Sequence, residues 1–375
     1  ISLDIHKSML RIMGHRVAYR RHSGNAVRFA VMFHKCAYAD RCGVFDVGLW
    51  LWYTVYIYTT YTQGDDMPQK FQYSDDGSRY HTLKYHNMRI WGRPVYKAVV
   101  DAGFTCPNID GSCGSGGCIY CSGGSGYFTA PALSVREQIL RESARIRVSH
   151  PNAGVIAYFQ AHTNTYGSPE RLREVYSQAL ECGVCGISCA TRADCIDGER
   201  AELLASLGVP VTVELGLQTA HDSTAEYINR GHDFARFLEG FRTAREYGLR
   251  VCVHIINGLP GETPEMMLQT AEILGKLRPD GVKIHLLHVI EGTALAQLWR
   301  GGDYATMDMQ DYIDVTVRQL ELLPAETVIE RLTGDGDRNT LLAPLWSLDK
   351  RAVLGGIMKR QKQLDSIQGA RFRED

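Results

Sequence analysis

The 375-residue chain lacks two features that would settle its class at once. It has no apolar run near the ~20 residues that a membrane-spanning helix needs. The one membrane-like stretch, residues 49–61 (LWLWYTVYIYTTY), is short and rich in Tyr and Thr, which favours a strand-like or interfacial segment. It also has no excess of one charge, with 41 Lys and Arg against 42 Asp and Glu. These absences argue against a membrane protein and against a polycationic nucleic-acid binder.

The first part of the chain is basic and carries no chemical motif. Residues 1–48 hold eight Lys and Arg against three Asp, about +5, so the remainder is about −6 of the total of −1. An aromatic run and then a polar break, residues 63–80, follow this start. We therefore expect residues 1–78 to form a poorly ordered N-terminal extension.

Cysteine is abundant, with eleven residues. A secreted disulfide scaffold is normally short and carries an even number of cysteines. An odd number in a long chain instead favours a reducing cytoplasm, where thiols hold metals or fill cores. The sequence thus predicts a cytoplasmic protein with a use for its thiols.

From residue 95 onward, short apolar runs alternate with longer amphipathic stretches. The runs cover residues 96–104, 154–160, 183–191, 210–218, 250–258 and 281–289, and the expected helices cover 134–146, 169–181, 197–207, 234–247 and 264–277. Asp197 and the pair Thr263-Pro264 are good helix starts, whereas Gly183, Gly208 and Gly248 stand where helices should stop. This alternation predicts right-handed βαβ units around a parallel sheet, open or closed into a barrel, with chemistry at the carboxyl ends of the strands.

The character of the sequence changes after residue 300. Residues 311–324 predict an amphipathic helix that stops at Pro324, residues 326–335 a strand and turn, and residues 343–366 a final helix. We therefore divide the chain into an N-terminal extension (1–78), a core (79–300) and a small C-terminal α/β extension (301–375).

Four cysteines gather just after the first expected strand, in TCPNIDGSCGSGGCIYCSGGSG, residues 105–126. A CxxC pair alone is a weak signal, and a zinc site with Cys106 and Cys113 as further ligands stays open on spacing. Three thiolates from one loop also suit a four-iron cluster that keeps one iron open for a ligand. The glycines let the backbone pass close to a bulky group. The cluster is the favoured interpretation.

Five segments together resemble the radical S-adenosylmethionine superfamily: FTCPNIDGSCGSGGCIYC, AYFQAHTNTYGS, ISCATRADCI, VELGLQTAHDSTAEYINRGH and HIINGLPGET. The resemblance runs from about residue 79 to 366 and is strongest to a bacterial family similar to the radical half of elongator-complex acetyltransferases. It implies a partial (β/α)6 barrel. The segment from Asp311 resembles that group's C-terminal extension. No acetyltransferase domain is recognisable.

The resemblance implies an enzyme with two cofactors, a [4Fe–4S] cluster and S-adenosylmethionine. The cluster ligands correspond to Cys106, Cys118 and Cys121, and Cys113 falls in a gap where the family needs no cysteine. Reductive cleavage of the cofactor would give methionine and a 5′-deoxyadenosyl radical that removes hydrogen from a substrate. An electron donor such as flavodoxin or ferredoxin is implied as a partner.

The same resemblance suggests which residues contact S-adenosylmethionine. Arginine pairs well with carboxylate, which makes two arginines candidates for the methionyl group. Glu214 and Gln218 are polar on one strand face and suit the ribose and methionine, although a satisfied core pair is the alternative. The predicted contacts are Tyr120, Gln160, Thr163, Arg192, Glu214, Gln218, Arg230, Gly258 and Gly261. His285 and His288 read as core histidines.

A second group of thiols, Cys182, Cys185, Cys189 and Cys195, could suggest another cluster. Cys185 and Cys189 alternate along a buried strand, where cysteine behaves as a small apolar residue, and this is the favoured interpretation.

The sequence says less about the substrate than about the cofactors. Kinship with elongator-like enzymes implies tRNA, at a wobble-uridine side chain, and the basic segments 1–48 and 70–97 could contact phosphates. The alternative is a non-catalytic metal- or cluster-binding, or RNA-binding, module.

Overall fold

A computed structural model describes residues 17–19, 29–31, 71–122, 129–334 and 336–374. The chain divides into two compact units, residues 1–67 and 68–375. In the first unit, β1 (Val17–Tyr19) and β2 (Phe29–Val31) pair antiparallel. Most of the predicted N-terminal extension, including the aromatic stretch 49–61, lies outside the described residues.

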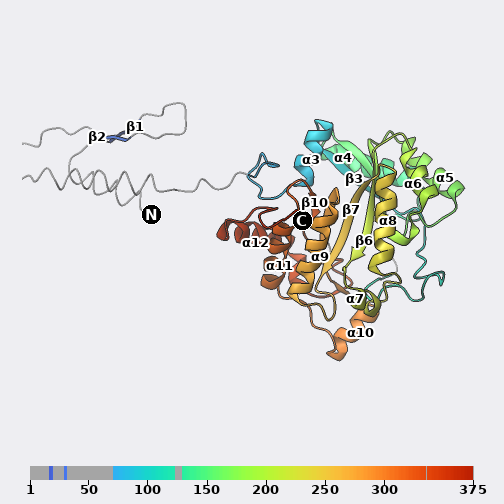
Figure 1. Ribbon diagram of the computed structural model, residues 1–375. Coiled ribbons are helices and arrows are strands. Elements are labelled where there is room, and N and C mark those ends of the chain that lie inside the picture. Colours follow the sequence, from blue (N-terminus) through green and yellow to red (C-terminus); the bar gives the residue numbers. More distant parts are fainter. Residues whose placement is uncertain (1–16, 20–28, 32–70, 123–128, 335, 375) are drawn as a thin grey trace, which may run out of the picture. The chain divides into compact units, whose positions relative to one another are not determined.

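The second unit is built on one sheet of seven parallel strands in the order β10-β8-β7-β6-β5-β4-β3, curled into a half-barrel (Figure 1). The strand order follows the chain because each helix returns the backbone to the start of the next strand, as right-handed βαβ units require. The strands are β3 (Val95–Val100), β4 (Gly154–Phe159), β5 (Gly186–Thr191), β6 (Val211–Gln218), β7 (Arg250–Asn257), β8 (Gly281–Leu286) and β10 (Val328–Arg331).

Helices connect the strands and begin where the sequence supplies caps. Ser134 and Glu137 form a capping box at the start of α4, and the Thr263 hydroxyl accepts the Met266 amide at the start of α9, 3.4 Å away. The helices are α3 (Leu83–Trp91), α4 (Val135–Ser149), α5 (Pro169–Leu180), α6 (Gly198–Ala205), α7 (Asp222–Tyr227), α8 (Phe234–Glu246), α9 (Pro264–Leu277), α10 (Ala294–Gly301), α11 (Met309–Leu322) and α12 (Lys350–Gln363).

The main core lies between one face of the sheet and these helices. Alternate strand residues such as Val213, Val253 and Ile284 are fully or almost fully buried there, together with helix residues such as Leu172 and Phe237. Side chains on the other face of the same strands point into the half-barrel, because successive residues of a strand point to opposite sides. That inner face carries polar groups.

The predicted half-barrel of strands and helices is confirmed, and the C-terminal residues add to it. The strand expected within residues 326–335 is β10, which pairs with β8 as the seventh strand of the same sheet. Two short elements, β9 (Val289–Ile290) and β11 (Leu341–Ala343), pair antiparallel beside it. No helix among the described residues is long and apolar enough to cross a membrane.

Candidate functional site

The cysteine loop follows β3, at the edge of the sheet where the strands end. Backbone hydrogen bonds fold the loop onto itself: the Ile109 amide donates to the Cys106 carbonyl (2.8 Å), and the Gly117 amide to the Asn108 carbonyl (2.8 Å). The Cys121 amide donates to the Cys118 carbonyl at 2.8 Å. Cys106 and Cys118 are half-buried and Cys121 is exposed, so the three predicted ligands share one compact loop with access to solvent.

The loop is also tied to its surroundings. The Ile119 amide donates to the Ile228 carbonyl (3.1 Å), and the Leu295 amide at the start of α10 donates to the Ile119 carbonyl (2.8 Å). Ile119 and Tyr120 pack on an apolar cluster that contains Ile228 and Leu295. In Figure 1, α7 and α10 lie near each other at one end of the half-barrel. The backbone between the second and third predicted ligands is therefore fixed by two other segments.

Two polar side chains approach the Cys118 sulfur. Asn108 Nδ2 lies 3.7 Å from it and Arg230 Nη1 lies 4.0 Å from it. Asn108 Nδ2 also donates to the Asn229 carbonyl at 2.6 Å. The Asn108 side chain fits against Gly231 because a Cβ there would lie 2.8 Å from Asn108 Oδ1, and Gly231 has a φ of +76° that favours glycine.

Arg230 is buried and only partly satisfied. Its Nη2 donates to the Gly216 carbonyl at 2.6 Å, next to the end of β6. The residue is only 6% exposed, and its Nε is buried without a hydrogen-bond partner. A buried guanidinium with an unused donor beside a predicted cluster ligand fits the charge of thiolate-bound iron or of a carboxylate.

Arg192, in contrast, has protein partners on all sides. Its Nε and Nη2 donate to the two oxygens of Asp194 (2.8 and 2.7 Å), and its Nη1 donates to the Arg230 carbonyl (2.8 Å). Burial alone would lower the pKa of Arg192, but the hydrogen bonds and charge of Asp194 outweigh it and raise that pKa. Arg192 thus holds the backbone of Arg230 in place.

The ends of β4 and β7 bring further predicted residues to this edge. The Thr163 amide donates to the Thr105 carbonyl at 3.2 Å, and the Gln160 amide to the Val100 carbonyl at 3.2 Å. Gly258 and Gly261 have φ values of +84° and +79°. A Cβ on Gly258 would lie 3.1 Å from Met307, so glycine allows that close approach.

The structure differs from the sequence interpretation at Glu214. Its two carboxylate oxygens are taken by protein donors: Lys97 and Ser188 bond Oε1 (2.6 and 2.5 Å), while Lys283 and His254 bond Oε2 (2.9 Å for His254). Glu214 is 1% exposed, and Gln218, four residues on, has a φ of +75° at the end of β6. Glu214 and Gln218 therefore lie in different places, with Glu214 inside the half-barrel and Gln218 at its edge.

The other cysteines have separate surroundings. Cys189 is buried 2.9 Å from the Tyr176 hydroxyl, Cys185 donates to the Val155 carbonyl (3.2 Å), and Cys182 donates to the Gln178 carbonyl (3.2 Å). Burial raises the pKa of the Cys189 thiol to about 12. These contacts support the interpretation of Cys185 and Cys189 as packing residues.

Within the described residues, no three His, Cys, Asp or Glu side chains are grouped as ligands of one metal ion. The thiolates of a cubane cluster bind different irons, so they stand further apart than the ligands of a single ion. The loop offers a cluster three cysteines, a backbone with several glycines, and buried cationic and amide donors at Cys118.

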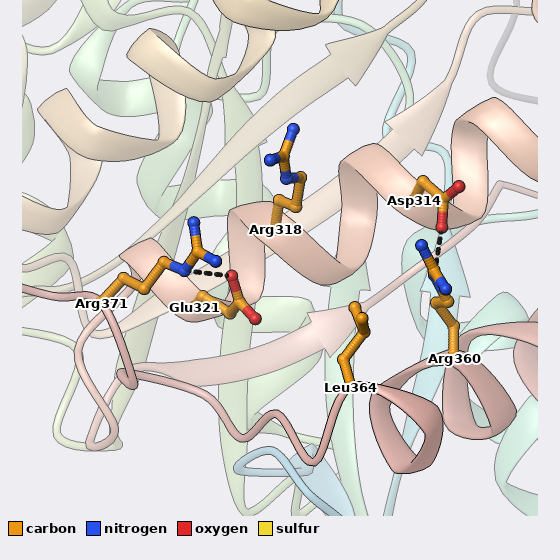
Figure 2. A pocket seen from close by; sticks show the side chains of 6 residues that line it. All are labelled: Asp314, Arg318, Glu321, Arg360, Leu364 and Arg371. Atoms are coloured by element: carbon orange, nitrogen blue, oxygen red, sulfur yellow. Dashed lines mark hydrogen bonds and ion pairs between the residues drawn. The ribbon is translucent and has the colours of Figure 1, made fainter.

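A separate hollow lies on the outer helices and contains none of the predicted site residues. Figure 2 shows Arg371 paired with Glu321 and Arg360 paired with Asp314 on either side of Arg318. The hollow has a volume of about 420 Å³ and is lined by Asp314, Arg318, Glu321, Arg360, Leu364 and Arg371. It involves the α11–α12 surface rather than the carboxyl edge of the sheet.

Comparisons with known proteins identify the family of the chain. The model of the radical SAM superfamily matches residues 111–274, and that of the radical SAM C-terminal domain matches residues 279–363. The chain is 42% identical over 307 residues to the uncharacterized protein YtqA of Bacillus subtilis, covering 80% of this chain and 95% of that protein. The chain belongs to the radical SAM superfamily, whose cofactors are a [4Fe–4S] cluster and S-adenosylmethionine.

More distant relatives extend the comparison to elongator proteins. Elongator complex protein 3 of Homo sapiens is 31% identical over 164 residues, which are 43% of this chain and 30% of that protein. The solved structure of the archaeal Methanocaldococcus infernus Elp3 with an N-terminal deletion aligns with a TM-score of 0.59 at 17% identity, covering 74% of this chain and 64% of that one. The structural likeness concerns the fold.

Several residues around the site gave no signal in the sequence. Asn108, Lys97, Lys283 and His254 belong to no metal or catalytic motif, yet they touch a predicted ligand or a predicted cofactor residue. A lysine inside an apolar strand run is the one pattern that could have drawn attention, because an uncompensated buried lysine is costly.

Proposed function

We propose that Cys106, Cys118 and Cys121 bind the cluster and that the neighbouring rim binds S-adenosylmethionine. The observation that carries the proposal is the cysteine loop itself, which folds at the carboxyl edge of the half-barrel with buried Arg230 and Asn108 at the Cys118 sulfur. When bound, the two cofactors supply a 5′-deoxyadenosyl radical that removes a hydrogen atom from the substrate.

The protein's own residues divide the work of positioning. Arg230, with its unused buried Nε, holds the methionyl carboxylate, and Arg192 positions Arg230 through the backbone carbonyl. Gly258 and Gly261, without side chains, let the backbone at the end of β7 approach the adenine. The remaining proposed contacts are Tyr120, Gln160, Thr163 and Gln218. Glu214 is omitted because its oxygens already have protein partners.

For the substrate, we propose a tRNA and, within it, a wobble-uridine side chain. The support is the sequence similarity to elongator complex protein 3, which covers less than half of this chain. A low-potential donor such as flavodoxin or ferredoxin would reduce the cluster, and such a system suits the cytoplasm. The alternative, a cluster- or RNA-binding module without radical chemistry, makes no use of the rim residues on β4, β6 and β7.

Anaerobic reconstitution tests the cofactor part of the proposal. Wild-type protein should hold about four irons per chain and, with dithionite and S-adenosylmethionine, release 5′-deoxyadenosine. The Cys118→Ala/Cys121→Ala variant should do neither, whereas Cys113→Ser, in the same exposed loop, should behave as wild type. Iron without 5′-deoxyadenosine under any reductant would favour the binding module, and zinc in place of iron would contradict the site.

The RNA part needs its own measurement. Reconstituted protein, reductant and S-adenosylmethionine are incubated with bulk tRNA, and the digested nucleosides are compared by mass spectrometry with those from the double cysteine variant. A mass change confined to a wobble uridine supports the proposal. Unchanged tRNA, together with turnover on a small metabolite or a protein, would contradict it.

A further inference from the structure

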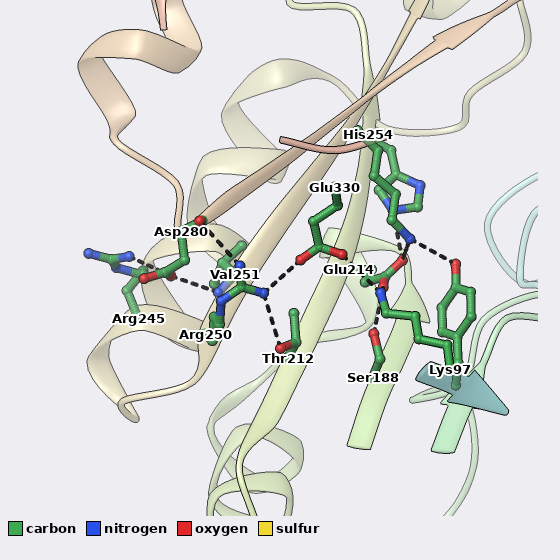
Figure 3. Close-up of polar contacts among 12 residues, drawn as sticks. Lys97, Ser188, Thr212, Glu214, Arg245, Arg250, Val251, His254, Asp280 and Glu330 are labelled. Atoms are coloured by element: carbon green, nitrogen blue, oxygen red, sulfur yellow. Dashed lines mark hydrogen bonds and ion pairs between the residues drawn. The ribbon is translucent and has the colours of Figure 1, made fainter. Parts of the chain in front are cut away.

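Inside the half-barrel, five charged side chains form a continuous network that we term the lumen ion cluster: Lys97, Glu214, Arg250, Lys283 and Glu330. Figure 3 labels Lys97, Glu214, Arg250 and Glu330. They come from five different strands of the same sheet. The parallel register spreads them along the lumen, since Lys283 pairs with His254, Glu214 pairs with Cys252, and Arg250 lies at the start of β7 opposite Thr212. The cluster is therefore a feature of the assembled lumen.

The signs of the charges alternate along the network. Lys283 and Lys97 both bond Glu214, Lys97 also bonds Glu330 (2.9 Å), and Arg250 closes the row on Glu330 (2.7 Å). Both carboxylates are almost fully buried, with side chains 0% and 1% exposed. Within the cluster, three cations thus stand against two carboxylates, and the Arg250 and Lys97 side chains remain 24% and 20% exposed.

Two further charged groups act on the cluster. Asp280 bonds Arg245 (2.7 Å) and accepts from Arg250 through its backbone carbonyl (3.3 Å). Although burial opposes it, the charges of Glu330 and Asp280 raise the pKa of Arg250, so Asp280 offsets positive charge at that end of the cluster. At the other end, burial and nearby positive charges, those of Lys283 and Arg331 among them, lower the pKa of His254 and His285, so positive potential acts on these two histidines.

Two histidines line the lumen next to this charge. His254 bonds Glu214 through Nε2 (2.9 Å) and lies 5.1 Å, ring centre to ring centre, from His285. His285 is two residues beyond Lys283 on the same face of β8, and its Nε2 is buried without a hydrogen-bond partner. A buried ring nitrogen with no partner is a polar group that a ligand can satisfy.

The position of these groups relates them to the rim. His254 is three residues before the end of β7 at Asn257, which Gly258 follows. The histidines thus lie between the lumen ion cluster and the proposed cofactor rim. Solvent reaches this wall, because the side chains of Lys97 and His254 are 20% and 16% exposed.

We infer that this inner wall binds an oxyanion group of the substrate, a carboxylate or a phosphate, with His285 Nε2 as a direct donor. Lys97 donates to Glu214 and Glu330, and Lys283 donates to Glu214 and to the Tyr158 hydroxyl (3.2 Å), so each ammonium has a third N–H and contributes charge. Each ammonium also lies over the Tyr158 ring, with Lys97 Nζ 4.7 Å and Lys283 Nζ 4.6 Å from the ring centre. The inference rests on the proposed function, because the oxyanion group belongs to the substrate of that reaction.

Equilibrium dialysis tests the inference directly. Full-length, cluster-reconstituted protein is dialysed anaerobically against radiolabelled inorganic phosphate and, separately, acetate, with chloride holding the ionic strength constant. His285→Phe removes the unpartnered nitrogen but keeps a ring against His254 and leaves every bond of Glu214 intact. His150→Phe is the matched control, because exposed His150 stacks on Tyr96 at 4.5 Å outside the lumen.

Wild type and His150→Phe should bind one ion per chain saturably, and His285→Phe should bind it about tenfold more weakly or worse. His285→Gln, which restores a polar atom, should recover part of the affinity. Whichever ion binds more tightly identifies the oxyanion. Absence of saturable binding to wild type, or equal binding by His285→Phe, would overturn the inference.

The same preparations separate this inference from the proposed function. The release of 5′-deoxyadenosine is measured in parallel without any substrate. Anion binding with no 5′-deoxyadenosine would remove the proposed function while leaving the oxyanion site. If His285→Phe and His150→Phe both release 5′-deoxyadenosine while wild type binds no anion, the oxyanion site is ruled out and the proposed function stands.

Discussion

The cysteine loop and the lumen ion cluster belong to one sheet, but they are held in place by different means. The loop is shaped by backbone hydrogen bonds among close neighbours, such as Ile109 to Cys106 and Cys121 to Cys118. The lumen ion cluster is held by side chains from strands far apart in sequence, with Lys97 117 residues from Glu214. Contacts between sequence neighbours thus shape the loop, whereas contacts between distant strands hold the lumen ion cluster.

The largest expected effect is on stability, from Glu214→Gln. This change leaves Lys97 and Lys283 without their shared carboxylate in a site where the Glu214 side chain is 0% exposed. We expect the free energy of unfolding to fall by about 3–5 kcal/mol, the usual effect of breaking a buried ion pair. Urea unfolding of the protein prepared without the iron–sulfur cluster measures this loss.

Two further variants sharpen that test. Glu239→Gln breaks the exposed pair with Arg236 and should cost no more than about 1 kcal/mol. Glu214→Gln combined with Lys283→Met should regain part of the loss, because the unpaired buried ammonium is gone. A loss for Glu214→Gln as small as that for Glu239→Gln would show that the lumen ion cluster contributes little to stability.

The second prediction concerns pH. Burial, with the positive charges of Lys283 and Arg331 nearby, holds the pKa of His254 and His285 below the ordinary 6.5. As pH falls below 6.5, the unfolded chain takes up protons that the folded state refuses. The free energy of unfolding therefore decreases toward acid by about 1.4 kcal/mol per pH unit for each such histidine.

Urea unfolding between pH 7 and pH 5 checks this slope. His285→Phe should reduce it by up to about 1.4 kcal/mol per pH unit, and His150→Phe should leave it unchanged. The carboxylates act in the same direction at lower pH. Although burial opposes it, Lys97 and Arg250 lower the pKa of Glu330, so its contribution is lost as pH falls below 4.5. An unchanged slope in His285→Phe would contradict the assignment.

The third prediction returns to the loop. Gly231→Ala imposes a left-handed backbone on alanine, at about 1–2 kcal/mol, and its Cβ would press on Asn108 Oδ1. Iron bound after reconstitution should fall, because Asn108 is displaced from Cys118. Gly103→Ala has the same kind of backbone strain at a φ of +71°, but its Cβ would meet no atom within 4 Å, so its iron content should match wild type. Equal iron content in both variants would show that Asn108 is not needed.

The smallest expected effect is on iron content when the other thiols are changed. Cys185→Ala/Cys189→Ala should keep the wild-type iron content, since these thiols have separate protein partners. The cost to stability should be roughly 1–3 kcal/mol, from the small void and the lost contact with Tyr176. Loss of half the iron in this variant would instead reveal a second cluster.

Local signals made much of the fold predictable. The apolar runs form strands within a few residues of the expected bounds, and the predicted helix starts at Asp197 and Thr263 have capping hydrogen bonds. Gly183, Gly208 and Gly248 have positive φ values where helices stop. These features depend on neighbours in sequence, so a single sequence carries them.

The ion pairs of the lumen ion cluster could not be predicted from local sequence signals. Lys97 and Lys283 look like isolated charges in apolar runs, and their partner Glu214 looked like a cofactor contact, because pairing depends on register across several strands. Similarly, β10 seemed to belong to a separate addition until its pairing with β8 placed it in the main sheet. Short strands after a helix give no local sign of which sheet they join.

The most direct test of the account is the electron paramagnetic resonance spectrum of the reconstituted, dithionite-reduced protein, recorded with and without S-adenosylmethionine. The account predicts a reduced [4Fe–4S] signal that changes when S-adenosylmethionine is added, because three cysteines leave one iron open to it. The signal should be absent from Cys118→Ala/Cys121→Ala and present in Cys113→Ser. A wild-type signal that S-adenosylmethionine leaves unchanged, or no iron–sulfur signal at all, would contradict the central claim.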